Sequence, residues 1–131
     1  MRTVLFVDDE PGVLDGLRRM LFPLRREWNQ LFAGSGEEAL RILAERPVDV
    51  IVSDMRMPGM DGAALLREVR QRHPEVVRFI LTGQTDDEAV YRTVGDAHQF
   101  LMKPCPPEVL KNTISRALTL RERLANPAVV G

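Results

Sequence analysis

Five side chains with charged or reactive groups come directly after short hydrophobic runs in this sequence. Two acids follow the first run, and an acid, a hydroxyl and an amine follow three later runs: Asp8 and Asp9, then Asp54, Thr82 and Lys103. Continuous hydrophobic runs of this length are typical of strands buried on both faces. If these strands are parallel, their carboxyl ends meet at one edge of a sheet, and all five side chains converge there.

The charges of such a cluster favour a divalent cation. Asp8, Asp9 and Asp54 would bring three negative charges into one shallow pocket, and like charges resist joint ionisation. Lys103 supplies one positive charge and Mg²⁺ would supply two, so the sum is zero. Oxygen ligands in a partly open shell suit Mg²⁺. No His or Cys follows these runs, which argues against zinc.

A pocket neutralised in this way could accept a phosphoryl group. Phosphoryl transfer depends on in-line positioning and on neutralisation of the equatorial oxygens. A carboxylate can act as the nucleophile and form an aspartyl phosphate. Asp54 is the best candidate because it ends a central strand between Asp9 and Lys103. An aspartyl phosphate is labile, so the modification would be temporary.

The rest of the sequence supplies the elements that must position these groups. Hydrophobic runs alternate with stretches of helical period along the chain, which predicts five βα units. We expect strands at residues 4–7, 28–33, 48–53, 76–81 and 99–102. Helices are expected at residues 11–24 with a doubtful last turn at Pro23, from a capping box at Ser35–Glu38, around 65–69, around 89–94, and at 107–124.

This alternation predicts one α/β domain. Its length of 131 residues suits a single compact unit, which we place at residues 1–124, with 125–131 as a C-terminal tail or the start of a linker. Strands alternating with helices imply a parallel sheet with helices on both faces. We expect the doubly wound, flavodoxin-like order 2-1-3-4-5 for the five strands. Residues 28–33 are less apolar than the other runs and therefore suit an edge strand.

Composition excludes several classes of protein. Hydrophobic residues at 44% and charged residues at 28% exclude intrinsic disorder. The 18 basic and 19 acidic residues give no basic excess, which argues against direct nucleic-acid binding. The first apolar run is too short for a signal peptide or a membrane span. We expect a cytoplasmic protein with no membrane contact. Cys105 is the single cysteine, so the chain has no internal disulfide.

Four stretches of this sequence resemble the response-regulator receiver domain of two-component signalling, and the likeness covers residues 2–124. The stretches are Val7–Glu10, Ser53–Gly62, Leu81–Gly83 and Phe100–Pro104. The resemblance implies that Asp54 accepts a phosphoryl group from a histidine kinase or a phosphotransfer protein. It also implies four Mg²⁺ ligands: Asp9, Asp54 and the backbone carbonyl of Arg56 directly, and Asp8 through water.

The same resemblance implies roles for residues later in the chain. Lys103 would pair with a phosphoryl oxygen, and Thr82 would donate a hydrogen bond to the phosphoryl group. Phe100 would turn inward as Thr82 moves, and Lys103–Pro104 resembles the cis peptide of the family. Two structural alternatives stay open. The Thr82 hydroxyl could cap the following helix, and Phe100 could be an ordinary core ring. Arg56 and Gln84 stand at positions that tune the phosphoryl lifetime in the family.

Other functions are weighed against a phosphoacceptor switch, which would catalyse only its own phosphorylation and dephosphorylation. An aspartyl phosphatase usually has a second Asp two residues after its nucleophile, where this chain has Arg56. A flavin or nucleotide binder needs a cradle rich in Gly, Ser and Thr after a strand, whereas the first run of this chain is followed by Asp8, Asp9 and Glu10. A degenerate receiver would act as a phosphorylation-independent interaction module. The presence of every acid, Thr82 and Lys103 disfavours that alternative.

The output of such a switch is a further expectation. The run 94–100 followed by Lys103-Pro104-Cys105 resembles receivers fused to HD-type output domains. We therefore expect a fragment of a longer regulator, whose output domain is covalently linked or separate. Phosphorylation would act through the face formed by the helix around 89–94, the strand 99–102 and the helix 107–124. The same face could form a homodimer.

Overall fold

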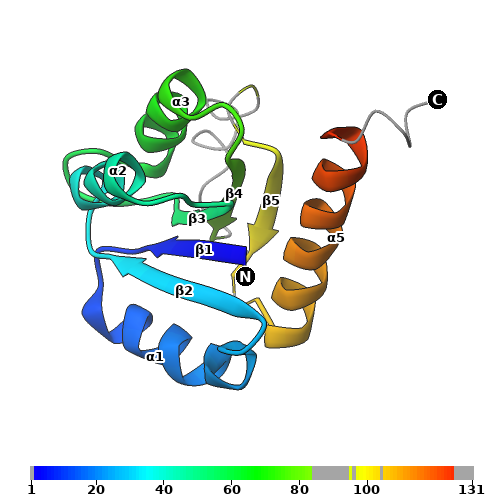
Figure 1. Cartoon of the computed structure of the whole chain (residues 1–131). Helices are drawn as coiled ribbons and strands as arrows, with labels where there is room; N and C mark the ends of the chain where they lie inside the picture. Colours follow the sequence, from blue (N-terminus) through cyan, green and yellow to red (C-terminus); the bar gives the residue numbers. More distant parts are fainter. Residues whose placement is uncertain (1, 84–94, 96, 104, 126–131) are drawn as a thin grey trace.

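Five parallel strands form one sheet in this computed structural model, which describes residues 2–83, 95, 97–103 and 105–125. The strands are β1 (Arg2–Val7), β2 (Trp28–Ala33), β3 (Val50–Asp54), β4 (Val77–Thr82) and β5 (Gln99–Met102). Their order is β2-β1-β3-β4-β5 (Figure 1), and all four pairings are parallel. The predicted doubly wound α/β fold is confirmed, with β2 at an edge.

Helices cover both faces of this sheet. The described helices are α1 (Pro11–Leu21), α2 (Gly36–Glu45), α3 (Gly62–Arg72) and α5 (Pro107–Ala125). Figure 1 shows α2 and α3 on one face, with α1 and α5 on the other. The helix expected around residues 89–94 lies outside the described residues. The domain boundary expected at residue 124 stays a prediction.

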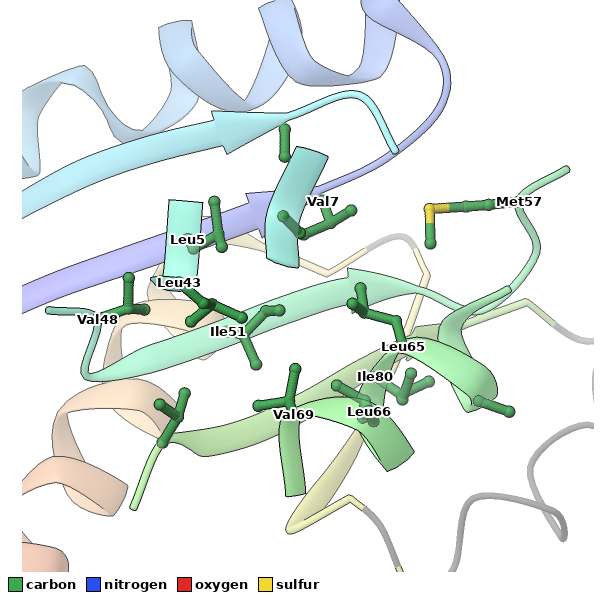
Figure 2. Packing of buried hydrophobic residues seen from close by; sticks show 14 of the residues in the cluster. Leu5, Val7, Leu43, Val48, Ile51, Met57, Leu65, Leu66, Val69 and Ile80 are labelled. Carbon is green, nitrogen blue, oxygen red and sulfur yellow. The ribbon is translucent and has the colours of Figure 1, made fainter. Parts of the chain in front are cut away.

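Each strand contributes side chains to two separate hydrophobic cores. Because successive side chains alternate across a strand, Leu5, Ile51 and Ile80 face α2 and α3 (Figure 2). On the other face, Val52 and Phe79 pack against residues of α1 and α5. All five of these side chains are fully buried. Packing on both faces of the sheet therefore fixes the positions of the carboxyl ends of the strands.

Several boundaries differ from the sequence prediction, and β1 for example begins at Arg2 instead of residue 4. The helix that begins at Pro11 ends at Leu21, and a 3₁₀ turn of residues Phe22–Leu24 follows it. Pro23 in this turn has no N–H to continue an α-helix. The third and fourth strands include Asp54 and Thr82 as their last residues instead of ending before them.

The third strand also begins two residues later than expected, and Asp49 just before it is joined to Thr3 by one backbone and one side-chain hydrogen bond. The Asp49 N–H donates to the Thr3 carbonyl, with 2.9 Å between N and O. The Thr3 N–H donates to the carboxylate of Asp49, with 2.8 Å between Thr3 N and Asp49 Oδ2. Regular backbone pairing with β1 then starts at Val50, which lies opposite Val4.

The expected capping box at the start of α2 is half formed. Ser35 Oγ accepts a hydrogen bond from the Glu38 N–H, with 3.1 Å between Oγ and N. The Glu38 carboxylate accepts from the Gly34 N–H at 2.9 Å instead of from the Ser35 N–H. Ser35 is fully extended, and the donor within reach of the carboxylate is that of the preceding residue. Both interactions satisfy N–H groups that would otherwise lack partners at a helix start.

A half-buried ion pair ties the end of α5 to the amino-terminal edge of the sheet. Arg121 donates to the Asp49 carboxylate, with 2.7 Å between Nη2 and Oδ1, and to the Asp49 carbonyl at 3.0 Å. It also donates to the carbonyl of Glu75 at 3.3 Å. Burial raises the pKa of Asp49, but the Thr3 N–H and the Arg121 guanidinium outweigh it, and the pKa lies below its usual value. We call this arrangement the Asp49–Arg121 pair.

The Asp49–Arg121 pair gives the first prediction. Asp49→Asn keeps the shape but loses the charge, and we expect the free energy of unfolding at pH 7 to fall by about 1 kcal/mol. A carboxyl with a lowered folded pKa stabilises fully above its unfolded pKa and loses this contribution as the pH falls through the folded pKa. The difference between wild type and variant should therefore shrink from pH 5 to pH 3. Urea denaturation at several pH values measures it.

A matched control for this prediction lies on α1. Asp15 is mostly exposed and its ion pair with Arg18 is 3.3 Å long, so Asp15→Asn should change stability by less than about 0.5 kcal/mol. An equal loss in both variants, or a difference between wild type and Asp49→Asn that does not depend on pH, would contradict the assigned role of Asp49.

Candidate functional site

Three carboxylates meet at the carboxyl ends of β1 and β3. Asp8 and Asp9 directly follow β1, and Asp54 is the last residue of β3. The two strands are neighbours, with Val7 opposite Ser53, so their ends lie side by side. One carboxylate oxygen from each acid lies within 4.8 Å of the others. The convergence expected from the sequence is therefore observed.

Lys103 brings a positive charge to this acid cluster. It follows β5, and its Nζ lies 2.5 Å from Asp54 Oδ1 and 3.9 Å from Asp8 Oδ2. Partial burial lowers the pKa of Lys103, but the hydrogen bond and charge of Asp54 outweigh this effect and leave the pKa above its usual value. The ammonium is thus fully protonated at neutral pH, and it is held directly against the candidate nucleophile.

Asp8 is the most deeply buried acid of the cluster, with 2% of its surface exposed. Its Oδ1 accepts a hydrogen bond from the Glu10 N–H at 3.0 Å. Its buried Oδ2 has no hydrogen-bond partner among the described residues. Burial is the main cause that raises the pKa of Asp8, and the charge of Asp54 adds to it, against the Glu10 N–H and Lys103. A buried acceptor without a partner is costly.

These observations test whether the cluster suits a metal ion. Its donors are carboxylate oxygens alone, the type that Mg²⁺ prefers. The unpartnered Asp8 oxygen and the single nearby ammonium leave the negative charge of three carboxylates only partly balanced. The donor set therefore fits a hard divalent cation.

The orphaned Asp8 oxygen gives the second prediction. Asp8→Asn replaces the carboxylate by a neutral amide, which removes repulsion from Asp54 and supplies a donor to the neighbouring carboxylates. We expect the free energy of unfolding in the presence of a chelator to rise by about 1 kcal/mol. Chemical denaturation with and without EDTA measures this change, and Asp15→Asn on α1 serves as the control. An unchanged or lower stability of Asp8→Asn in chelator would contradict the electrostatic description of the site.

Thr82 stands at the same edge of the sheet. It is the last residue of β4, is 3% exposed, and lies opposite Met102 in the pairing with β5. Its carbonyl accepts a hydrogen bond from the Lys103 N–H at 2.8 Å. The Thr82 hydroxyl contacts the sulfur of Met102, with 3.5 Å between Oγ1 and Sδ. Met102 was not among the residues expected at the site, although its place immediately before Lys103 was a usable signal.

Phe100 lies further from the edge than the other predicted site residues. It pairs with Ile80, two positions before the pair formed by Thr82 and Met102. Residues two apart on a strand share a face, so Phe100 and Met102 project on the same side as Thr82. The Phe100 side chain is half-buried and packs against the core under α2 and α3. The structure thus gives Phe100 a packing role on the same side of the sheet as Thr82.

Gly62, which was expected only as part of a loop, supports the position of Asp54. The Gly62 N–H donates to the Met55 carbonyl at 2.8 Å. A Cβ at Gly62 would collide with the Asp54 carbonyl oxygen and would lie 3.0 Å from Met55 Cα. Only glycine allows this close approach between α3 and the end of β3. The preceding Asp61 caps α3 by accepting from the Ala64 N–H at 2.8 Å, and an acid before a glycine is a recognisable helix start.

The remaining predicted site residues have less defined places. Arg56 is exposed two residues after Asp54, in the segment between β3 and α3. Pro104 and Gln84 lie outside the described residues, and so does the peptide that joins Lys103 to Pro104.

Comparison with known proteins decides the family. A family model described as "Response regulator receiver domain" matches residues 4–115. The chain belongs to this family. The match begins within β1 and spans the other four strands, so it includes the acid cluster, Thr82 and Lys103.

Individual relatives agree with this assignment of the receiver domain. The chain is 42% identical over 118 residues to the hydrogenase transcriptional regulatory protein HoxA of Cupriavidus necator. This match covers 88% of the chain but 24% of HoxA, so the receiver spans about a quarter of that relative.

Solved structures of receiver domains have the same fold as this chain. The receiver domain of an HD domain-containing protein from Pseudomonas fluorescens has a TM-score of 0.85 and 30% identity, and the match covers 92% of this chain and 97% of that one. A receiver domain protein from Clostridium thermocellum also has a TM-score of 0.85, with 31% identity and coverage of 95% and 99%. In the part of the receiver that the structure describes, no helix combines the length and apolarity needed to cross a bilayer.

Proposed function

We propose that this receiver is a phosphoacceptor switch in which Asp54 accepts a phosphoryl group from a histidine kinase or a phosphotransfer protein. The observation that carries the proposal is the 2.5 Å contact between Lys103 Nζ and Asp54 Oδ1, inside a cluster of three carboxylates. A carboxylate paired with a single ammonium can act as the nucleophile and is already beside a group that can bind the product.

The transfer follows from the positions of these side chains. An Asp54 carboxylate oxygen attacks phosphorus, and the bond between phosphorus and the donor nitrogen breaks. Lys103 is placed to exchange its contact with Asp54 for one with a phosphoryl oxygen, which neutralises charge there. Asp8, Asp9, Asp54 and the Arg56 carbonyl are the groups that would hold Mg²⁺. When bound, the ion would supply positive charge to the carboxylates and the phosphoryl oxygens.

The switch itself would involve β4 and β5. The Thr82 hydroxyl contacts Met102 Sδ, a weak acceptor, so little is lost when the hydroxyl turns to a phosphoryl oxygen. That rotation changes the space beside Phe100, which we propose moves further inward. The altered face would include β5 and α5 and would control an output domain or a homodimer contact. Phosphorylation would then shift the equilibrium between two conformations of this surface.

The kind of output is part of the proposal. An HD-type output is favoured by the resemblance of residues 94–100, and the solved relative from Pseudomonas fluorescens comes from an HD domain-containing protein. HoxA, at higher identity, is instead a transcriptional regulatory protein. We propose that the chain works as the receiver of a longer regulator, and the complete reading frame of its gene identifies the output.

The decisive experiment is incubation of the purified protein with acetyl phosphate and Mg²⁺, followed by intact-mass measurement. We expect the mass to increase by one phosphoryl group and the increase to disappear in hydroxylamine, which cleaves acyl phosphates. An interaction module that does not use phosphorylation would show no increase. An aspartyl phosphatase would instead hydrolyse an external phosphoester with repeated turnover, and a chromogenic phosphoester in the same buffer tests this alternative.

A further inference from the structure

A second concave site lies at the opposite edge of the sheet from the acid cluster. The pocket has a volume of about 960 Å³ and is formed by residues just before or at the start of β3 and β4, together with α5 and the end of α2. Asp54 and Thr82 end these same strands, so the length of the sheet separates the pocket from the phosphoacceptor site. Pockets that bind small organic molecules usually measure roughly 300–1,000 Å³.

The walls of this pocket are largely apolar. Val48, Val76 and Phe79 are buried side chains that face it from the sheet side. Ala117 and Leu120 face it from α5, and 58% of the Leu120 surface is exposed. An exposed leucine beside a buried apolar wall offers a surface that an apolar ligand would cover.

The pocket also carries unbalanced positive charge. Asp49 and Arg121 line it but neutralise each other, with 2.7 Å between Oδ1 and Nη2. Two more arginines line it, Arg46 and Arg116, and both are exposed. Within the described part of the chain, the guanidinium groups of these two have no ion pair or hydrogen bond. The remaining carboxylate is that of Glu75, so one positive charge stays in excess.

We propose that this pocket binds a small organic anion with an apolar body. The body would lie against Val76, Phe79 and Leu120, and the anionic head would pair with Arg46 and Arg116. Arginine suits this role because its planar guanidinium binds carboxylate, sulfonate or phosphate oxygens through two parallel hydrogen bonds. The pocket and Asp54 lie at opposite ends of the strands, so ligand binding in the pocket does not depend on the proposed phosphorylation.

The test uses 8-anilinonaphthalene-1-sulfonate, an amphipathic anion whose fluorescence rises in apolar surroundings. Titration of the full chain should show saturable binding of one molecule per protein. N-phenyl-1-naphthylamine, which has the same rings without the sulfonate, should bind about five- to tenfold more weakly. Backbone chemical shifts recorded during the titration should move around Val76 and Ala117, with no comparable change around Asp54.

Matched variants separate specific binding from general adhesion to apolar surface. The double variant Arg46→Gln, Arg116→Gln should weaken sulfonate binding about five- to tenfold and leave the uncharged analogue unchanged. Glu75→Gln should strengthen sulfonate binding, because it removes the opposing charge. The control Arg19→Gln, Arg41→Gln removes the same net charge from exposed positions outside the pocket and should have no effect beyond about twofold.

Three results would overturn the proposal. The first is the absence of saturable binding by the wild type. The second is equal weakening in the pocket variant and the control, which indicates a nonspecific effect of net charge. The third is loss of dye binding as protein concentration rises, with a matching increase in sedimentation coefficient. That result would assign the pocket to contact between two copies of the chain.

Discussion

Asp54→Asn is expected to abolish phosphoryl incorporation from acetyl phosphate. The amide of asparagine is not a nucleophile toward phosphorus, whereas its size and shape match the carboxylate at the end of β3. Asp54 is 8% exposed and ends a strand whose core side chains are fully buried, so an amide of the same shape should leave the fold unchanged. Intact-mass measurement after incubation with acetyl phosphate and Mg²⁺ should show no modified protein, and circular dichroism should match the wild type.

Two measurements make the assignment of Asp54 specific. The control Asp15→Asn removes an acid that is exposed on α1, and this variant should incorporate phosphate at the wild-type rate. Borohydride reduction of the labelled wild type followed by peptide mass analysis should place the modification at residue 54. Undiminished labelling of Asp54→Asn would show that Asp8 or Asp9 is the acceptor. The roles of the three acids would then differ from those proposed.

Removal of divalent cations is expected to reduce phosphoryl incorporation by on the order of 100-fold or more, the scale for losing one electrostatic stabiliser of a transition state. Lys103 alone offsets one of three neighbouring negative charges, and an incoming phosphoryl donor adds more. An excess of EDTA during incubation with acetyl phosphate tests this, again by intact mass. Adding back Mg²⁺ should restore labelling, and Na⁺ at equal ionic strength should not.

A thermodynamic measurement complements this labelling experiment. A ligand that binds the folded protein raises its stability with concentration. Mg²⁺ should therefore raise the midpoint of thermal unfolding in the wild type, and by much less in Asp9→Asn, which removes one of the proposed ligands. Labelling that persists in EDTA, or an equal shift of the midpoint in both proteins, would show that the cluster works without a metal ion.

The sheet was predictable from sequence because the hydrophobic signal is strong in its central strands. The runs at residues 48–53 and 76–81 are apolar on both faces apart from Asp49, Ser53 and Arg78, and such strands fit a parallel sheet between two helical layers. Strand ends were less predictable. The third strand begins at Val50, and the Asp49 carboxylate just before it accepts a hydrogen bond from the Thr3 N–H, 46 residues away in the sequence. Local pattern does not contain such a contact.

The candidate site was predictable in its membership but not in its contacts. Position directly after a hydrophobic run identified Asp8, Asp54 and Lys103, and convergence followed from parallel topology alone. The 2.5 Å contact of Lys103 with Asp54 depends on side-chain rotamers, which sequence spacing does not specify. The orphaned Asp8 oxygen and the contact of Thr82 with Met102 depend on packing between neighbouring strands. The close approach of Gly62 to Asp54 likewise required coordinates.

The Asp49–Arg121 pair has a mechanical consequence for anything joined to α5. Arg121 lies four residues before the end of that helix and is anchored through oxygens of Asp49 and Glu75, just ahead of β3 and β4. The carboxyl-terminal end of α5 is therefore attached to the sheet through Arg121. We expect a displacement at β5 to tilt the helix about Arg121 instead of sliding it, so that an attached domain would rotate more than translate.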